Sequence, residues 1–462
     1  MKWEKLLSEK RPVRENLRSG QYDLRSEFEI DYHRIVTSAS FRRLQDKTQV
    51  FPLDKSDFIR TRLTHSLEVA SIARSLGQNI TSALLKSGRD PEFTPEMQGR
   101  VCDLLQSAGL IHDIGNPPFG HFGEETIREW FQNHLKDLVY EGKSADEQLT
   151  EQQKLDFLRF EGNAQGLRMA ARLDYPYNDA GMNLTYGLLS SMIKYPASSM
   201  EAAPDSPDIR KKKNGYFASE QELFERIAEE TGTGSSRNPL AFILEAADDI
   251  AYAAADIEDA FKKGFFSFEK LTEEFRERGT AKTYLLRLTD RYDFARLQGT
   301  VLPEEYAVRS WLREMQDVLL IAATEGFLEH YDEIMEGSFS REIICGRNES
   351  RMLRVLKSTA YDYAFTSMSI FKTEIAANRI LNALLDILIP SACTLDGENA
   401  GIMDEKYLSL IPESYKQICR KSSDGKCASE RLYARMQMGM DTVSGMTDSY
   451  AKDLYSELTG IH

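Results

Sequence analysis

The residues that could most clearly take part in chemistry lie in one short stretch, 108–124, of this 462-residue chain. An apolar helical segment ends there in the adjacent pair His112-Asp113, and the sequence Ile-Gly-Asn-Pro-Pro then breaks the helix. Two further ionisable residues, His121 and Glu124, follow beyond the break. A buried helix has no packing reason to end in this pair, whereas imidazole and carboxylate are ordinary ligands of a divalent metal ion. The pair alone is a weak signal, so its partners elsewhere decide its meaning.

Two other segments offer side chains of the same types. His65 lies in an amphipathic helical pattern over 60–70, where a single histidine is more often structural than a ligand. In the helical pattern over 245–260, Asp248, Tyr252 and Asp256 recur every four residues and therefore share one face. A solvated acidic face explains the other acids of that segment. It explains Asp248 less well, because its neighbours along the stripe are Ala, Ile and Tyr.

The composition is that of an ordinary globular protein, with 41% hydrophobic and 28% charged residues. No apolar run approaches the ~20 residues that span a bilayer, and the charged N-terminus is unlike a secretory signal. Five cysteines without a Cys-x-x-Cys pair indicate a reducing cytoplasm and argue against a thiolate zinc site. The net charge of −15 does not suit a nucleic-acid coat, but a local basic pocket could still hold a small polyanion. We therefore expect a cytoplasmic protein without a membrane span.

Helical periodicity dominates the chain. Apolar residues recur at three- and four-residue spacing over 63–76, 242–255, 306–334, 352–366 and 370–389. The best strand-like stretch is 215–219, which could form one arm of a hairpin. Loop signals cluster at 85–96, 141–151, 196–215, 229–239 and 394–404. The pattern predicts one large α-helical body with a few inserted hairpins.

The order His, His-Asp, Asp along the chain is similar to the HD superfamily of metal-dependent phosphohydrolases. The surrounding segments resemble, more narrowly, the bacterial deoxyguanosinetriphosphate triphosphohydrolases. Matching segments run in the expected order at 25–36, 41–51, 60–69, 115–124, 160–165, 194–196, 248–252 and 444–451. The resemblance implies an all-α fold, with an HD helical core, appended C-terminal helices and a minor β-hairpin. It also implies three regions: an N-terminal segment (1–60) that contributes to the nucleotide site, an HD core (61–262) and a C-terminal helical region (263–462) packed on the core.

For the metal site, the resemblance implies one divalent ion held by His65, His112, Asp113 and Asp248. The mixed nitrogen and oxygen shell leaves Mn, Fe, Co, Ni, Zn and Mg as alternatives. Such an ion can act as a Lewis acid and activate water near neutral pH. His121 would be the general acid/base and Glu124 would hold it in place, because proton transfer needs a group that titrates near neutrality.

That family cleaves a deoxynucleoside triphosphate to the deoxynucleoside and inorganic tripolyphosphate, and the resemblance implies binding residues for each part. Gln49 and Asp256 would bind the sugar 3′-hydroxyl, and Tyr252 would fill the space of a 2′-hydroxyl. The triphosphate carries up to four negative charges and needs several donors. These would be Arg62, Asn163, Lys194, Tyr195 and Lys213. For Lys211 and Lys212, which adjoin Lys213, a solvated charge run is the simpler explanation.

Two alternatives stay open. The chain could be an HD phosphohydrolase for another nucleotide, such as a deoxynucleoside monophosphate or guanosine tetraphosphate, although the predicted 3′-hydroxyl ligands and lysine-rich phosphate site argue against both. It could also be a nucleotide-sensing protein without catalysis, which fits less well with a complete ligand set. The family admits an activating nucleotide or single-stranded DNA. It also tends to form hexamers, so we expect a homo-oligomer.

Overall fold

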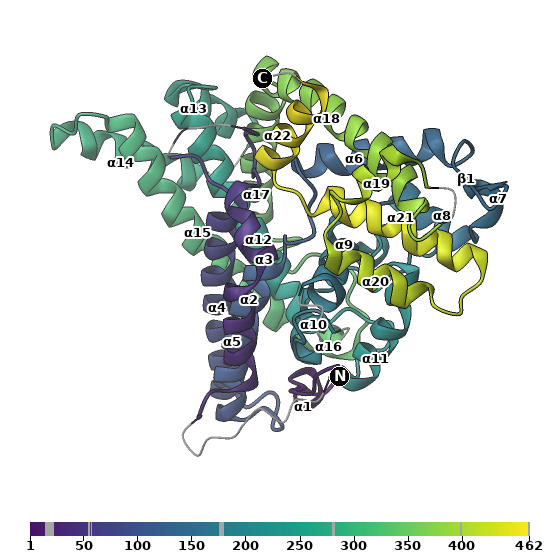
Figure 1. Ribbon diagram of the computed structural model, residues 1–462. Helices are drawn as coiled ribbons and strands as arrows, with labels where there is room; N and C mark the ends of the chain where they lie inside the picture. Colours follow the sequence, from purple (N-terminus) through teal and green to yellow (C-terminus); the bar gives the residue numbers. More distant parts are fainter. Residues whose placement is uncertain are drawn as a thin grey trace.

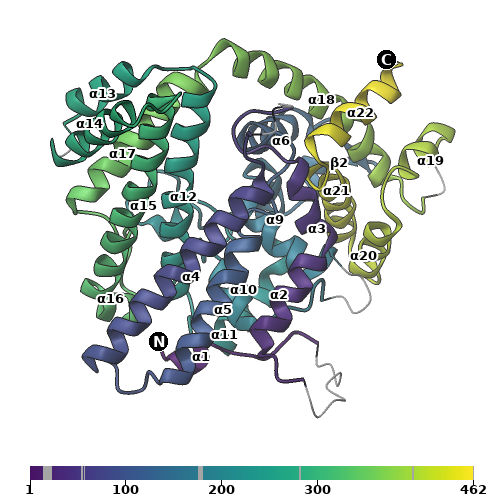
Figure 2. The same cartoon turned by 90° about the vertical axis from the view of Figure 1, so that its left-hand side faces the viewer.

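The computed structural model describes residues 1–13, 23–53, 56, 58–174, 180–279, 282–397 and 400–460, and Figures 1 and 2 show it from two directions. Within these residues the fold is almost entirely helical. The single sheet that they form is a two-stranded antiparallel hairpin of β1 (Val139–Tyr140) and β2 (Lys143–Ser144). The predicted all-α fold with a minor hairpin is therefore confirmed.

The position predicted for the hairpin was wrong. Residues 215–217 form an irregular loop that leads into a 3-10 turn, Ala218–Glu220. Gly215 passes so close to another segment that a Cβ there would lie 1.9 Å from the Tyr195 carbonyl oxygen, and its backbone nitrogen donates to the Ala197 carbonyl at 2.9 Å. The observed hairpin lies at the start of a segment predicted as loop. Its turn residues Glu141 and Gly142 both have positive φ angles, 48° and 80°, which suits a tight hairpin turn.

The helices have the following bounds. The N-terminal part contains α1 (Trp3–Leu6), α2 (Glu27–Thr37), α3 (Ala39–Arg43) and a 3-10 turn (Leu44–Asp46). The middle of the chain contains α4 (Arg62–Ser87), α5 (Pro95–Ile111), α6 (Gly120–His134), α7 (Ala145–Gln148), α8 (Glu151–Leu158), α9 (Gly162–Arg168), α10 (Tyr186–Met192), α11 (Gln221–Thr231) and α12 (Pro239–Lys262). A π-helical turn (Met169–Leu173) continues α9, and a 3-10 turn (Ile209–Lys211) follows α10.

The remaining helices follow α12. They are α13 (Phe268–Glu277), α14 (Lys282–Leu297), α15 (Pro303–Glu329), α16 (Tyr331–Glu336), α17 (Asn348–Ala360), α18 (Met368–Cys393), α19 (Ile402–Leu408), α20 (Glu413–Ser423), α21 (Ala428–Ser444) and α22 (Asp448–Thr459). A π-helical turn, Tyr361–Phe365, continues α17. In Figure 1, α14 projects from the rest of the molecule. The predicted division of the chain at residues 60 and 262 stays a prediction.

The centre of the fold is an antiparallel pair of helices, α4 and α5, with α12 packed against both (Figure 2). The pair crosses at very short range, because a Cβ on Gly109 of α5 would lie only 2.5 Å from the Ala70 Cα of α4. Only glycine permits this approach. The crossing lies close in sequence to the predicted ligands His65 and His112, so it brings the two histidines together.

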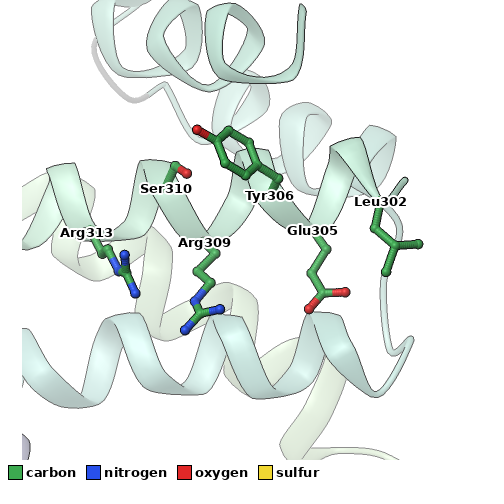
Figure 3. A pocket seen from close by; sticks show the side chains of 6 residues that line it. All are labelled: Leu302, Glu305, Tyr306, Arg309, Ser310 and Arg313. Carbon is green, nitrogen blue, oxygen red and sulfur yellow. The ribbon is translucent and has the colours of Figure 1, made fainter. Parts of the chain in front are cut away.

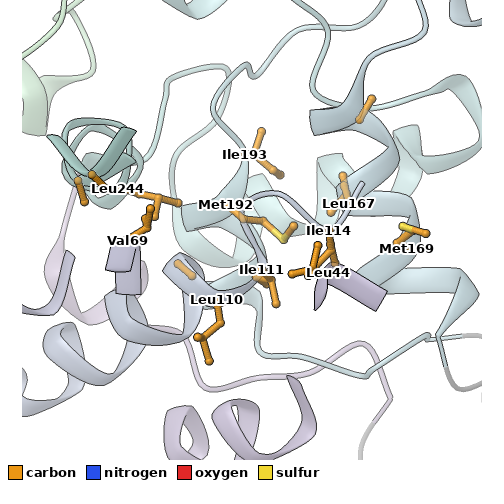
Figure 4. Packing of buried hydrophobic residues seen from close by; sticks show 14 of the residues in the cluster. Leu44, Val69, Leu110, Ile111, Ile114, Leu167, Met169, Met192, Ile193 and Leu244 are labelled. Carbon is orange, nitrogen blue, oxygen red and sulfur yellow. The ribbon is translucent and has the colours of Figure 1, made fainter. Parts of the chain in front are cut away.

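Apolar residues next to the predicted ligands are buried in the core beneath the site (Figure 4). Val69 lies one helical turn beyond His65, and Leu244 lies one turn before Asp248. Leu110 and Ile111 occupy the last turn of α5. Burial of these neighbours fixes the helix faces that carry the ligands.

Helix α18 is long and apolar enough to span a bilayer by length and composition alone. Its few polar residues interrupt the apolar run, so the sequence pattern alone did not indicate a membrane span here. Half of its most apolar stretch is buried in the protein, and the helix packs against α6 and α21. Burial in the core therefore accounts for part of its apolar composition, while Met368, Phe371 and Ile375 near its start are exposed.

A buried ion-pair network joins α9 to α21. The Arg168 guanidinium donates to Asp441 at 2.7 Å and to Glu220 at 2.8 Å, and the exposed fractions of these side chains are 7%, 1% and 0%. The Gln165 amide donates to the same Asp441 carboxylate at 2.9 Å. Removal of one partner from such a network leaves an uncompensated buried charge.

We expect Arg168→Met to lower the free energy of unfolding by about 3–5 kcal/mol, because both carboxylates lose their cation in a buried setting. Urea denaturation would measure the loss. As a control, Arg420→Met removes an ion pair with Asp396 and Glu413 at the surface, which should cost no more than about 1 kcal/mol. Equal losses in the two variants would contradict the role assigned to the network.

Candidate active site

The four predicted metal ligands come together from three helices. His65 lies on α4, His112 caps the end of α5 with Asp113 next to it, and Asp248 lies on α12. The Nε2 atoms of His65 and His112 lie 3.2 and 3.3 Å from Asp248 Oδ1. His112 Nε2 also lies 3.6 Å from Asp113 Oδ1. One ligand atom each of His65, His112 and Asp113 lies within 4.8 Å of the others, which is a suitable spacing around one metal ion.

His112 has the orientation of a metal ligand. His112 Nδ1 lies 2.8 Å from the Gly109 carbonyl oxygen, so this nitrogen is the donor and Nε2 keeps its lone pair. Nε2 is buried and has no hydrogen-bond partner. Burial disfavours the protonated ring, yet the Asp113 and Asp248 carboxylates raise the pKa of His112. The residues therefore create a place that favours a cation, and a divalent metal ion fits it.

Both carboxylates of the cluster are also paired with cationic side chains. Arg62 donates to Asp113, and Lys194 Nζ lies 2.6 Å from Asp248 Oδ2. Although burial opposes ionisation, the charges of His112 and Arg62 keep the pKa of Asp113 well below its ordinary value. Lys194 and His112 do the same for the pKa of Asp248. The acids are thus ionised and available as ligands, and two predicted triphosphate residues stand beside them.

His121 and Glu124 form a hydrogen-bonded pair on the first turn of α6. His121 Nδ1 lies 3.2 Å from Glu124 Oε2, and this bond raises the pKa of His121. The Glu124 side chain is only 1% exposed, and it also accepts from the Gly162 backbone nitrogen at 2.8 Å and from Arg128 at 3.1 Å. The imidazole itself is 75% exposed. A fixed carboxylate therefore orients a histidine that an incoming ligand can reach.

The loop after the metal ligands contacts the first turn of α9 backbone to backbone. A Cβ on Gly115 would lie 2.1 Å from the Gly162 carbonyl oxygen. A Cβ on Gly162 would lie 2.3 Å from Asn116 Oδ1 and 2.7 Å from Glu124 Oε1. These glycines let the metal-binding loop, the His121–Glu124 pair and the turn that carries Asn163 lie together.

At that turn, Asn163 and Lys213 meet on a carboxylate to which the sequence analysis assigned no role, Glu161. The Asn163 amide donates to Glu161 Oε1 at 2.8 Å, and Lys213 Nζ lies 3.0 Å from the same oxygen. Burial and the Glu124 charge raise the pKa of Glu161. The acid stands inside the 160–165 motif, which was the available signal. The neighbours of Lys213, Lys211 and Lys212, are exposed.

Tyr195 follows Lys194 and is partly buried. Burial and the charge of Glu245 raise the pKa of its hydroxyl, while Lys194 and Lys213 oppose that shift. Both lysines are thus close enough to Tyr195 to act on its charge. Shared partners or charge interactions connect four of the five residues predicted for the triphosphate, namely Asn163, Lys194, Tyr195 and Lys213. The fifth, Arg62, contacts the metal ligand Asp113.

The three residues predicted for the sugar have the features of a hydroxyl-binding pocket. Both carboxylate oxygens of Asp256, and Oε1 of Gln49, are buried without a hydrogen-bond partner. Burial and the charge of Asp259 raise the pKa of Asp256 well above its ordinary value, although the nearby Tyr252 hydroxyl opposes that shift. The Tyr252 ring lies edge-on to His65, with 6.2 Å between centroids, and stacks on Phe365 at 6.5 Å. Buried polar groups without partners are rare, so these acceptors point to a ligand that donates to them.

Two surface clefts lie away from this cluster. One of about 350 Å³ lies on α15 and is lined by Leu302, Glu305, Tyr306, Arg309, Ser310 and Arg313 (Figure 3). The other, of about 650 Å³, lies among α4, α12 and α15 and shares Arg309 and Arg313 with the first. None of the predicted metal, acid/base or substrate residues lines either cleft. Neither contains a set of metal ligands, so the chemistry favours the histidine–aspartate cluster as the active site.

Comparison with known proteins agrees with this geometry. The HD domain family model matches residues 62–171, which include three of the four predicted ligands, while Asp248 lies beyond the match. The chain is 42% identical to a deoxyguanosinetriphosphate triphosphohydrolase-like protein of Listeria monocytogenes and 33% identical to one of Synechocystis sp., over the full length of each. It is 30% identical to a deoxyguanosinetriphosphate triphosphohydrolase of Serratia proteamaculans, over 95% of this chain and 94% of that protein.

We expect Asp113→Ala to lower the affinity for a divalent ion by at least about 100-fold, because even residues that only orient metal ligands contribute 10–100-fold. Elemental analysis after purification and dialysis would measure the bound metal. Asp103→Ala, which removes an acid of α5 paired with Arg74, should keep the wild-type content. Wild-type metal content in Asp113→Ala would refute the ligand assignment.

Proposed function

The chain belongs to the deoxyguanosinetriphosphate triphosphohydrolase family of HD-domain proteins, and on this premise we propose that it hydrolyses deoxynucleoside triphosphates to deoxynucleoside and inorganic tripolyphosphate. Family membership supports a nucleotide phosphohydrolase that binds a divalent metal. The proposal adds the substrate class, the products and one metal ion per chain. The ion would be Mn, Fe, Co, Ni, Zn or Mg, according to the mixed ligand set.

The observation that carries the proposal is the order of three side chains on one face of α12. Asp248 stands in the metal cluster, Tyr252 comes one turn later, and the unpartnered Asp256 follows after another turn. The distance along the helix from the first to the last is roughly 12 Å at 1.5 Å per residue. That length suits a nucleotide that runs from its α-phosphate at the metal to its sugar hydroxyl at Asp256. Gln49 would be the second hydrogen-bonding partner of the same 3′-hydroxyl, which has one hydrogen to donate and lone pairs that accept.

The triphosphate would be bound by the cationic groups around the metal cluster. Arg62, Lys194 and Lys213 supply charge, and Asn163 and Tyr195 supply neutral donors. Held by several contacts, the chain of phosphates presents its α-phosphorus to the reacting water in a fixed orientation. A divalent ion, when bound, would supply Lewis-acid stabilisation of the developing charge.

His121 would carry the proton that the reaction moves. Cleavage at the α-phosphorus leaves a 5′-alkoxide on the deoxynucleoside, which needs a proton as it departs. The bond to Glu124 raises the pKa of His121, which favours the protonated ring that can donate this proton. The exposure of the ring leaves it accessible to the substrate.

A different nucleotide substrate fits the site less well. A 3′-diphosphate, as in guanosine tetraphosphate, would bring negative charge against the buried Asp256 and the acceptor of Gln49. A deoxynucleoside monophosphate would leave Lys194 and Lys213 without phosphate partners. A nucleotide-sensing protein would have no use for the His121–Glu124 pair. A homo-oligomer, favoured as a hexamer, and activation by a nucleotide or single-stranded DNA are part of the proposal by family resemblance alone.

The products of dGTP hydrolysis test the proposal directly. Incubation with Mn²⁺ or Mg²⁺, followed by ion-exchange chromatography, should yield deoxyguanosine and tripolyphosphate in equal amounts. Release of dGMP, pyrophosphate or orthophosphate would overturn the reaction type. No turnover of any of the four dNTPs would favour the sensing protein.

For the acid/base pair, we expect His121→Ala to lower kcat by roughly 10²–10⁴-fold with unchanged metal content. Glu124→Gln should move the alkaline limb of the kcat–pH profile to lower pH. The reason is that Glu124 raises the pKa of His121, so its loss lets the imidazolium deprotonate earlier as pH rises. Glu125→Gln, which changes the adjacent exposed acid, serves as control. A profile that is identical in Glu124→Gln and wild type would contradict the pairing.

For the sugar pocket, we expect a strong preference for dGTP over GTP, and Tyr252→Ala should narrow this ratio of kcat/KM by at least about tenfold. The analogue 2′,3′-dideoxy-GTP should bind poorly, because each buried acceptor left unpaired costs about 1–3 kcal/mol. Competition kinetics with the three nucleotides would measure both effects. Tyr292→Ala, on the distant helix α14, should keep the wild-type ratio. Equal use of dGTP and GTP by the wild type would defeat the pocket assignment.

A further inference from the structure

Each cationic side chain proposed to hold the triphosphate is paired with a carboxylate. For Arg62 and Lys194 the partners are Asp113 and Asp248, which belong to the metal cluster. A divalent ion at the cluster would share the charge of those two carboxylates. Both cations would then be available to phosphate oxygens. The proposed metal site therefore already accounts for these two ion pairs.

Lys213 differs, because its partner Glu161 is outside the metal cluster. Glu161 Oε1 accepts from Lys213 Nζ at 3.0 Å and from the Asn163 amide at 2.8 Å. The Glu161 side chain is 5% exposed, so these donors take the place of water around it. One carboxylate oxygen thus accepts hydrogen bonds from both of the side chains that we propose bind a phosphate oxygen.

Glu161 also lies close to a second buried acid. The Glu124 charge and burial together raise the pKa of Glu161. The backbone nitrogen of Gly162, the next residue, donates to Glu124 Oε1 at 2.8 Å, which holds the two acids on one turn. A polyphosphate that binds here adds further negative charge. Whether Glu161 then takes up a proton or rotates away, Lys213 and Asn163 are released from it.

We propose that Glu161 is a positioning residue. Its carboxylate binds Lys213 and Asn163 as a phosphate oxygen would, and it competes with the polyphosphate for these two side chains. The inference rests on the proposed function. The carboxylate keeps both donors ordered before the substrate arrives. It also lowers the affinity for inorganic tripolyphosphate, because like charges repel at short range. The lower affinity favours release of that product.

Glu161→Gln tests the competition, because it keeps the size and the Oε1 acceptor but removes the charge. In calorimetric titration with inorganic tripolyphosphate and Mn²⁺, we expect this variant to bind about tenfold more tightly than wild type. Tripolyphosphate should inhibit its dGTP turnover at correspondingly lower concentration, and KM for dGTP should fall. Metal content and the thermal unfolding midpoint should not change.

Glu274→Gln is a matched control, since Glu274 is 7% exposed and pairs with Lys270 and Arg278 on α13. It should bind tripolyphosphate as the wild type does. In a Lys213→Met background, the gain from Glu161→Gln should shrink to less than about twofold, because the shared donor is gone. Glu161→Asp withdraws the carboxylate by one methylene and should tighten binding by a smaller factor, which provides a second variant if the first does not fold.

Weaker or unchanged tripolyphosphate binding by folded Glu161→Gln would overturn the proposal, as would a full gain in the absence of Lys213. Absence of binding in every variant would overturn it too. The measurement needs no turnover, so its failure is distinct from failure of the proposed reaction. If the wild type binds tripolyphosphate but makes no deoxyguanosine from dGTP, the proposed function fails, and the affinity ratio still decides the role of Glu161.

Discussion

The structure of the site depends on the need of two partly buried carboxylates, Asp113 and Asp248, for positive charge. A buried ion is costly unless cations and hydrogen-bond donors surround it. The Arg62 guanidinium and the Lys194 ammonium supply that charge, and the two imidazole rings lie beside the same carboxylates. The place between the carboxylates and the ring nitrogens favours a divalent ion for the same reason. The cationic side chains that balance the acids are the ones that we propose bind the triphosphate.

This concentration of charge is possible because the backbone segments approach one another unusually closely. Gly109 lets α5 cross α4 at Ala70, and Gly115 and Gly162 let the metal-binding loop contact the first turn of α9. With these contacts, ligands separated by up to 183 residues in sequence meet within hydrogen-bond distance. A side chain at any of the three glycines would separate segments whose spacing the chemistry requires. The apolar residues in the adjacent turns hold the helices in this arrangement.

Much of this could be predicted from the sequence where local patterns carry the information. The adjacent His112-Asp113 pair and the four-residue recurrence of Asp248, Tyr252 and Asp256 each determine a local geometry, and family resemblance joined them. The helical fold followed from apolar spacing in the same way. Assignment of individual roles to these residues stays a prediction that the structure supports by proximity.

Other features depend on contacts between distant segments, which local patterns do not encode. Residues 215–219 have strand-like side chains, but Gly215 packs against the Tyr195 carbonyl and no strand lies beside it. Glu161 is a single acid whose meaning comes from Lys213, 52 residues away in sequence. Phe365 reaches Tyr252 from a π-helical turn, which the apolar spacing of 352–366 does not distinguish from an ordinary helix.

We infer that two histidines and two aspartates together hold a divalent ion. X-ray absorption spectroscopy of the Mn²⁺- or Co²⁺-loaded protein measures that first coordination shell directly. We expect scattering from two imidazole rings together with oxygen ligands, and loss of one ring in His65→Ala. A shell of oxygen atoms alone, or a spectrum that His65→Ala and His112→Ala leave unchanged, would contradict the account.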